Sequence, residues 1–245
     1  MTWNPLEMVP GRLPALACLQ AKKRSVKKLY LYEKSQAARE FEKLVPPHQI
    51  FYADRQRLDQ LAGGIVHQGV VLQAELLPLL SLEEWLVRND RPDCILLVLD
   101  CIEDPQNFGA IVRSAAACGA SGVLFQKDRA APVSPAAVKA AAGGMEYVDL
   151  IQVTNLSRSL LQLQESGFWT AALDSDGDTR LWSADLTGRI ALIIGNEGAG
   201  VRRLILKNAD FHLAIPLIGE VTSLNASVAA GIALAECLRQ RVPKD

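Results

Sequence analysis

The stretch LIIGNEGAGVRR, residues 192–203, is an apolar run that breaks into three glycines within six residues and then turns basic. This order is typical of a strand that enters a glycine-rich turn and continues into a helix. Such turns often bind a phosphate at the helix N-terminus. The spacing, however, is G-x-x-G-x-G, and no G-K-[ST] follows, so neither a dinucleotide fingerprint nor a P-loop is present. The turn by itself is equally compatible with a purely structural loop between a strand and a helix.

Outward from this turn, apolar runs and helical patterns alternate from Cys94 onward. Strands that are apolar throughout and separated by helices predict an α/β fold with a mostly parallel sheet covered on both faces. The expected strands are CILLVLD (94–100), SGVLFQ (121–126), YVDLIQV (147–153), FWTAALD (168–174), RIALIIG (189–195) and FHLAIP (211–216). A long helix is expected at about 225–241.

The first ~76 residues predict a separate, small α/β unit. Its strands are expected at 28–33, 49–53 and 69–76, and its helices at 35–44 and 54–62. Residues 77–93 are interpreted as a linker with one helical piece, which Ser81 would cap. The expected organisation is therefore a domain at 1–76, a linker at 77–93 and a second domain at 94–245.

Composition limits the possible nucleic-acid-binding surface, the cellular compartment and the possibility of a membrane span. Lys and Arg number 26 against 27 Asp and Glu, so any nucleic-acid-binding surface must be local. The five cysteines are widely spaced and accompany three histidines without a zinc pattern, which favours a reduced, cytoplasmic compartment. The longest apolar runs are too short to span a bilayer, and no secretory signal pattern is evident.

Three polar loops are expected where strands end and helices begin. Two more segments accompany the glycine-rich turn: DPQNFGAIVRSAAACGA (104–120) and IPLIGEVTSLNASVAAGIALAE (215–236). In an open parallel sheet the carboxyl ends of the strands share one edge, where ligands bind. The sequence therefore predicts one site built from three loops.

These three segments resemble the three motifs of the SPOUT superfamily. Within it they are most similar to the TrmH-like RNA ribose 2′-O-methyltransferases, particularly the RlmB-type enzymes of large-subunit (23S-type) ribosomal RNA. The match covers residues 94–243. The N-terminal stretch is similar to the family's small RNA-binding domain of the L30e kind, through its layout and the segment GGIVHQGVVL (63–72).

The resemblance implies a C-terminal domain tied in a deep trefoil knot, whose loops bind S-adenosylmethionine. Gly195 would let the chain pass close to this cofactor, and backbone groups near Ile215 and Leu224 would bind it. The resemblance also implies a homodimer through the C-terminal domain, with the last helix packed against its mate. In-line methyl transfer requires no metal, and no metal site is expected.

The motifs also assign a catalytic set, each member of which has a simpler alternative. Its members are Asn107, Arg113, Glu197, Ser223 and Asn225. Arg113 would otherwise be a solvated helix charge, Glu197 a first-turn acid, and the others helix caps. Because a guanidinium stays protonated, we favour for Arg113 stabilisation of the ribose alkoxide or binding of the adjacent phosphate over a role as base. Glu197 would orient the catalytic Arg or Asn.

The densest basic run is KKRSVKK at 22–28, with five basic residues in seven. A run of this kind is either a solvated surface or a phosphate-binding patch. Its position in the suspected RNA-binding domain favours RNA contact by Lys22, Lys23, Arg24, Lys27 and Lys28. Arg202 and Arg203 are equally open to RNA contact or a solvated role, and His67 is expected to be structural.

The leading functional hypothesis is an RNA ribose 2′-O-methyltransferase, with a guanosine of large-subunit ribosomal RNA as the expected target. Three alternatives remain. A transfer RNA is the alternative substrate. A non-catalytic RNA-binding ribosome-assembly factor is opposed by the intact motif residues. A nucleotide-binding oxidoreductase is disfavoured by the glycine spacing.

Overall fold

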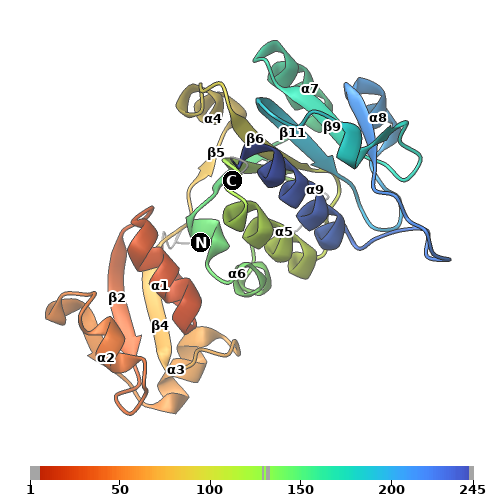
Figure 1. Ribbon diagram of the computed structural model, residues 1–245. Coiled ribbons are helices and arrows are strands. Elements are labelled where there is room, and N and C mark those ends of the chain that lie inside the picture. Colours follow the sequence, from red (N-terminus) through yellow and green to blue (C-terminus); the bar gives the residue numbers. More distant parts are fainter. Residues whose placement is uncertain (1–5, 129, 131–132, 243–245) are drawn as a thin grey trace. The chain divides into compact units, whose positions relative to one another are not determined.

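The computed structural model describes residues 6–128, 130 and 133–242, and the chain forms two compact units (Figure 1). The N-terminal unit comprises Met1–Pro78 together with Ala142–Tyr147. The C-terminal unit comprises Leu79–Ala141 and Val148–Asp245. The chain therefore passes from one unit to the other three times.

The N-terminal unit contains one four-stranded sheet with the order β1-β4-β2-β3. Strand β4 is antiparallel to both β1 and β2, whereas β3 is parallel to β2. The elements, in chain order, are β1 (Leu6–Pro10), α1 (Arg12–Ala21), β2 (Val26–Leu31), α2 (Ala38–Phe41), a 3₁₀ turn (Pro47–Gln49), β3 (Ile50–Tyr52), α3 (Arg55–Ala62) and β4 (Val70–Glu75).

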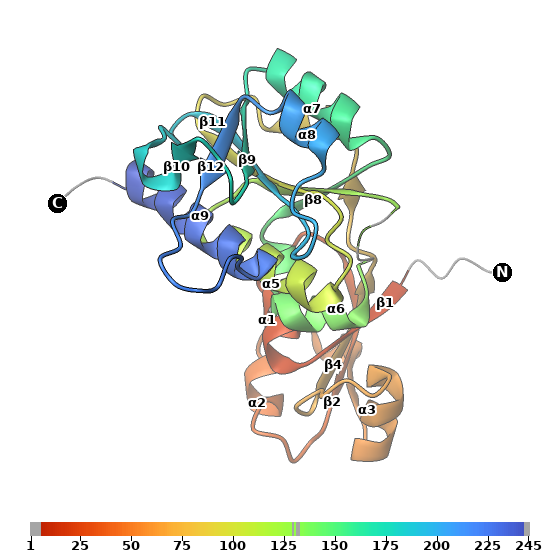
Figure 2. The same cartoon turned by 90° about the vertical axis from the view of Figure 1, so that its right-hand side faces the viewer.

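Side-chain alternation along β2 explains the layers of this unit. Leu29 and Leu31 pack in the cluster that contains residues of α1 and α2, whereas Tyr30 lies with Leu58 of α3 on the opposite face. Successive strand residues point to opposite faces of a sheet, so each face receives its own helices. Helices α1 and α2 therefore cover one face and α3 the other (Figure 2).

The C-terminal unit contains an eight-stranded sheet with the order β10-β12-β9-β11-β6-β7-β8-β5. Every strand pair in it is parallel, which confirms the predicted α/β class. The strands are β5 (Leu79–Leu80), β6 (Cys94–Leu99), β7 (Gly122–Gln126), β8 (Asp149–Val153), β9 (Trp169–Leu173), β10 (Thr179–Arg180), β11 (Arg189–Ile194) and β12 (Phe211–Ala214).

Helices cover both faces of this large sheet (Figures 1 and 2). Trp85, Leu160 and Ile205 join Leu96 and Val98 in one core cluster, so α4, α7 and α8 share a face. The other face carries α5, α6 and α9 (Figure 1). The helices are α4 (Leu82–Arg88), α5 (Pro105–Ala117), α6 (Pro135–Ala141), α7 (Leu156–Glu165), α8 (Arg203–Asn208) and α9 (Ala226–Arg241), with a 3₁₀ turn at Leu181–Ser183. A further 3₁₀ turn, Gly144–Glu146, belongs to the N-terminal unit.

The segment 77–93 differs from the expected linker. Strand β5 pairs with β8 at the sheet edge, and Trp85 is fully buried in the core of the C-terminal unit. The Ser81 cap does form, as a capping box in which Ser81 and Glu84 bond each other's backbone. Burial of Leu82 and Trp85 outweighs the loop-like polar residues that suggested a linker.

Two further expectations differ from the structure. Residues 142–147 belong to the N-terminal unit, although they lie inside the expected second domain. A Cβ on Gly143 would lie 2.6 Å from Ala17 Cβ, so glycine permits this close approach. The structure also adds β1 and α1, which the sequence did not predict, and shortens the expected 35–44 helix to Ala38–Phe41.

Candidate active site

A cavity of about 450 Å³ lies at the carboxyl edge of the large sheet. Strands β9, β11 and β12 are parallel neighbours, so the loops that follow them meet at this edge. We name it the motif cavity. Its lining comes from residues 173–176, 194–201, 203, 206, 213, 215, 217, 222–224, 226 and 229. Its volume falls in the range of small-molecule sites.

Within the glycine-rich turn the chain folds back on itself. The backbone N–H and C=O groups of Asn196 and Gly200 bond each other at 2.8 and 3.1 Å. A Cβ on Gly195 would lie 2.2 Å from the carbonyl carbon of Gly200. Glycine at 195 is thus required by the protein's own backbone, a reason that differs from the expected approach to a cofactor. Gly195 does line the motif cavity, as do Ile215 and Leu224.

Three side chains distant in sequence form a hydrogen-bonded group, which we name the Asn–Glu–Asn cluster. Asn107 Nδ2 donates to Glu197 Oε1, across 90 residues of sequence. Asn225 Nδ2 donates to Asn107 Oδ1 at 3.0 Å and to Glu197 Oε1 at 3.4 Å. The cluster therefore joins one residue from each of the three motifs, as the sequence predicted.

Helix caps position two members of the cluster. Asp104 caps α5 by accepting from the backbone N–H groups of Gln106 and Asn107, both at 3.2 Å. Asn107 is therefore inside the helix and its amide is free to reach Glu197. Asn225 caps α9 through Oδ1, which accepts from Ser227 N at 2.9 Å, while its Nδ2 joins the cluster. Capping and site membership coexist in this residue.

Arg113 lies apart from the Asn–Glu–Asn cluster. It is exposed on α5 and makes no hydrogen bond or ion pair with the residues that the structure describes. It follows Asn107 by six positions of the helix, which places the two about 9 Å apart along the axis and about 120° apart around it. Ser223 lines the motif cavity and is exposed, also without joining the cluster.

Arg202 anchors the end of the glycine-rich turn. Its backbone N–H and its Nε donate to the two carboxylate oxygens of Asp100 at 2.8 and 2.7 Å, and Nη2 donates to Gln126 at 2.6 Å. Asp100 is fully buried at the end of β6. The hydrogen bond that Arg202 donates to this carboxylate raises the pKa of Arg202. Arg202 is thus structural, whereas Arg203 lines the motif cavity.

Sequence reasoning missed one wall of the motif cavity. Leu173 lines it from the end of β9, and Asp174, Ser175 and Asp176 line it from the loop that follows. A signal was available, because Asp174 ends a predicted strand of the parallel sheet and Ser175 and Asp176 directly follow it. They were overlooked because the loop resembles none of the three motifs.

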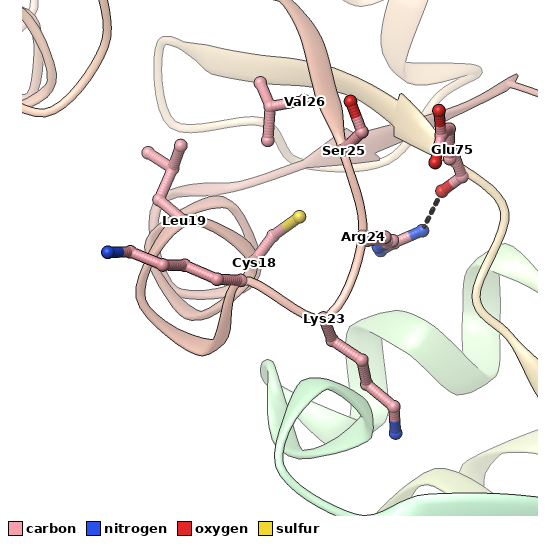
Figure 3. A pocket seen from close by; sticks show the side chains of 8 residues that line it. Cys18, Leu19, Lys23, Arg24, Ser25, Val26 and Glu75 are labelled. Atoms are coloured by element: carbon pink, nitrogen blue, oxygen red, sulfur yellow. Dashed lines mark hydrogen bonds between the residues drawn. The ribbon is translucent and has the colours of Figure 1, made fainter.

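The basic run 22–28 does not form one surface. Arg24 is 7% exposed, and its guanidinium pairs with Glu146 at 2.5 Å and with Glu7. The guanidinium also donates to the backbone carbonyl of Glu75 at 2.9 Å (Figure 3). The predicted RNA contact by Arg24 is therefore corrected to a buried ion pair. Although burial lowers the pKa of Arg24, the two carboxylates outweigh it and the pKa is raised.

The lysines of the run lie in different surroundings. Lys22 and Lys23 line a pocket of about 450 Å³ in the N-terminal unit (Figure 3). Lys27 is paired with Glu75 at 2.7 Å, and Lys28 Nζ lies 5.3 Å from the centre of the Phe51 ring. Phosphate contact by these four residues stays a prediction.

Two features are absent from the described part of the chain: a group of clustered metal-ligating side chains and a membrane-spanning helix. No group of three or more His, Cys, Asp or Glu side chains is placed to hold an ion there. Within the same residues, no helix is both long and apolar enough to cross a bilayer.

The chain matches two family models. Residues 94–235 match the SpoU rRNA Methylase family, and residues 8–79 match the RNA 2′-O ribose methyltransferase substrate-binding family. The two matches fall on the C-terminal and N-terminal halves that the sequence pattern separates.

Known proteins resemble the chain over nearly its whole length. The 23S rRNA (guanosine-2′-O-)-methyltransferase RlmB of Pseudomonas putida is 39% identical over 98% of this chain and 99% of that protein. The protein of the same name from Escherichia coli is 44% identical over 77% of this chain and 78% of its own length. The SpoU methyltransferase AviRb of Streptomyces viridochromogenes, solved with AdoMet, is 25% identical with a TM-score of 0.78 over 97% of this chain and 91% of that one. The chain therefore belongs to the SpoU rRNA methylase family.

Proposed function

We propose that this chain transfers a methyl group from S-adenosylmethionine to a ribose 2′-hydroxyl of RNA, in a guanosine of large-subunit (23S-type) ribosomal RNA. The observation that carries the proposal is the meeting of all three motif loops. Each loop supplies a residue to the Asn–Glu–Asn cluster, and two of them line the motif cavity. Membership of an rRNA methylase family agrees with this chemistry.

The motif cavity fits the proposed cofactor in size and lining. Apolar side chains such as Leu213 and Leu224 lie beside polar groups such as Asp174 and Ser223, a combination that suits a ligand with apolar and charged parts. Gly195, Ile215 and Leu224 would hold S-adenosylmethionine, which supplies an electrophilic methyl group when bound. The AviRb structure with AdoMet supports the same ligand class.

The protein's contribution to the reaction is orientation and electrostatic stabilisation. Glu197 holds the amides of Asn107 and Asn225, so that both are fixed when RNA arrives. Arg113 carries a permanent charge that stabilises the alkoxide as the hydroxyl proton leaves, or binds the neighbouring phosphate. Ser223 would orient the substrate or bind the methionine end of the cofactor.

We further propose a homodimer through the C-terminal unit, with both chains completing each site. Four exposed apolar side chains on or before α9 support it: Ile218, Val221, Val228 and Leu238. A second copy that covers them would remove apolar surface from water. A dimer would also explain why Arg113 lies apart from the Asn–Glu–Asn cluster of its own chain, because this arginine would then act in the partner's site.

Three finer features belong to the same proposal. The loops around 195–225 would form the trefoil knot of the family, and the N-terminal unit would be an RNA-binding domain of the L30e kind. Its mixed sheet covered on both faces supports the latter, as does the match to a substrate-binding family model. Ribosomal RNA as substrate places the protein in the cytoplasm.

The test uses the full chain, labelled S-adenosylmethionine, and separate pools of unmodified ribosomal and transfer RNA. We expect label in ribosomal RNA, at a guanosine 2′-oxygen mapped by resistance to alkaline cleavage. Label mainly in transfer RNA would refute the substrate, and no label in either pool would favour the non-catalytic assembly factor. Light scattering at micromolar concentration measures the oligomeric state. A monomer that is active would refute the proposed homodimer.

A further inference from the structure

A pocket of about 330 Å³ lies in the N-terminal unit, away from the basic run. Three segments form it: the residues after β2, the first turns of α3, and the turn at 66–69 before β4. The Lys22–Lys23 pocket, in contrast, includes Val26 at the start of β2. At ~3.3 Å per strand residue, β2 is roughly 17 Å long, and the two pockets lie at its opposite ends. We name the one at 66–69 the His67 pocket.

Hydrogen bonds fix the wall of the His67 pocket. The backbone N–H of Gly69 donates to His67 Nδ1 at 3.0 Å, so the ring proton is on Nε2. Nε2 in turn donates to Asp59 Oδ1 at 3.1 Å. His67 is only 7% exposed, so this neutral imidazole orients Asp59 rather than meeting a ligand itself.

The turn before β4 is held in a conformation that most residues avoid. Gln68 has a φ of 51° and Gly69 a φ of 82°. A Cβ on Gly69 would lie 2.6 Å from Ser35 Cβ, so the turn packs tightly against the chain after β2. Left-handed backbone at a non-glycine residue costs free energy and concentrates at ligand-binding sites.

The groups that the pocket presents differ in kind. Tyr32 offers an aromatic ring and is half-buried. Asp59 has a side chain 63% exposed, although His67 holds one of its oxygens. Arg55 is exposed and makes no ion pair with the described residues. A ring, a hydrogen-bond acceptor and an unpaired guanidinium match the three parts of a nucleotide.

We propose that the His67 pocket binds one unpaired nucleotide of the RNA. The base stacks on Tyr32, N–H groups on the base edge donate to Asp59, and Arg55 binds an adjacent phosphate. The proposal rests on the proposed function in one respect, that RNA is the substrate. Asp59 separates this pocket from a pure phosphate site, in which a carboxylate would repel the ligand.

The first test compares two arginines on the same helix. Full-length protein is titrated into a short fluorescein-labelled single-stranded oligoribonucleotide, and anisotropy gives Kd. Arg55→Gln is expected to raise Kd about fivefold or more, from the loss of one charge-assisted phosphate contact. Arg57→Gln is the matched control, because Arg57 bonds Gln60 and does not line the pocket. Equal Kd values for the two variants would overturn the proposal.

The second test concerns the base. Tyr32→Ala is expected to raise Kd about fivefold or more, whereas Tyr32→Phe keeps the ring and the affinity. Circular dichroism and thermal melting confirm that the Ala variant is folded; if it is not, crosslinking of the wild-type chain to a 4-thiouridine oligonucleotide replaces it. The crosslink is then expected on a peptide that contains Tyr32 or residues 66–69. Unchanged affinity in Tyr32→Ala, or crosslinks confined to residues 22–28, would overturn the proposal.

Two further arms separate this inference from the proposed function. An oligonucleotide with abasic residues should lose the effect of Tyr32→Ala and retain that of Arg55→Gln. Free guanosine monophosphate should compete only weakly; competition as strong as by RNA would make the pocket a mononucleotide site and overturn the proposal. Methyl transfer is measured in parallel on the wild-type chain. Binding with no methyl transfer would refute the proposed function alone, whereas transfer without these Kd effects would refute the pocket alone.

Discussion

The motif cavity and the basic run 22–28 are opposite cases of sites expected from sequence. Asn107, Glu197 and Asn225 are up to 118 residues apart, yet they bond one another because parallel strands deliver their loops to one edge. The basic residues are neighbours in sequence, yet Arg24 turns inward to a glutamate 122 residues away. A topology that gathers loops is a firmer guide to a site than a run of like charges.

The largest expected effect is on stability, and it tests whether Arg24 is a buried ion-pair residue. In Arg24→Met the Glu146 carboxylate, 5% exposed, would stay buried without its cationic partner. Removing one member of a buried pair costs about 3–5 kcal/mol, so we expect that loss in the free energy of unfolding. Urea denaturation measures it. Lys28→Met serves as the exposed control and should leave stability unchanged. A stable Arg24→Met variant with weakened RNA binding would restore Arg24 to the RNA-binding surface.

The next effect concerns catalysis at the motif cavity. Arg113→Ala should reduce turnover about 10²–10³-fold, because one electrostatic stabiliser of the developing charge is lost. Cofactor affinity should stay within a few-fold, since Arg113 does not line the motif cavity. Methyl-transfer kinetics and calorimetry measure the two quantities. Arg158→Ala on α7 is the control. Near-normal turnover in Arg113→Ala would show that the motif assignment is wrong.

A smaller effect is expected within the glycine-rich turn. Gly195→Ala would place a Cβ 2.2 Å from the backbone of Gly200, so the turn must shift, at about 1–3 kcal/mol. We expect lower stability and weaker binding of S-adenosylmethionine. In Gly198→Ala the new Cβ would meet only Asn196 Oδ1, at 3.5 Å, an ordinary contact. If both variants bind the cofactor equally well, the close approach at Gly195 is not what shapes the cavity.

The surface lysines give a finer comparison. Lys28 is exposed and has no carboxylate partner among the described residues, whereas Lys27 is paired with Glu75. If both lie near RNA, Lys28→Gln should lower the slope of log K against log salt by about 0.7, the value for one single-strand phosphate contact. Lys27→Gln should lower it less, because Glu75 already neutralises that charge. Unchanged slopes in both variants would make the run a solvated surface.

The smallest expected effect is at Cys101. Its φ of 57° lies in the left-handed region, where glycine is favoured. Cys101→Gly should therefore raise the melting temperature slightly, for a gain of at most about 1 kcal/mol. Cys118→Gly is the control, because Cys118 has a φ of −94° and gains nothing from glycine. A lower melting temperature in Cys101→Gly would contradict this account.

The sequence by itself determined many of the local elements and indicated which loops share one edge of the large sheet. Continuous apolar runs predicted β6, β7 and β11, because a strand buried on both faces needs no polar alternation. Polar residues before helical patterns predicted the cap at Ser81 and made a cap the simpler alternative for Asn225; both caps depend only on neighbouring backbone groups. The three motifs then predicted that their loops meet at one sheet edge, where Asn107, Glu197 and Asn225 bond one another; the catalytic roles assigned to these residues stay predictions.

Only the tertiary structure decided where ambiguous segments belong. Residues 79–88 entered the large sheet and its core, residues 142–147 joined the N-terminal unit, and Arg24 became buried. Arg113 lies away from Asn107, Glu197 and Asn225, the motif residues that form the Asn–Glu–Asn cluster. Each outcome depends on partners far along the chain, whose contacts outweigh local propensity and charge pattern. A local sequence pattern indicates which helix or strand a segment can form. Long-range packing decides which other parts of the chain that helix or strand contacts.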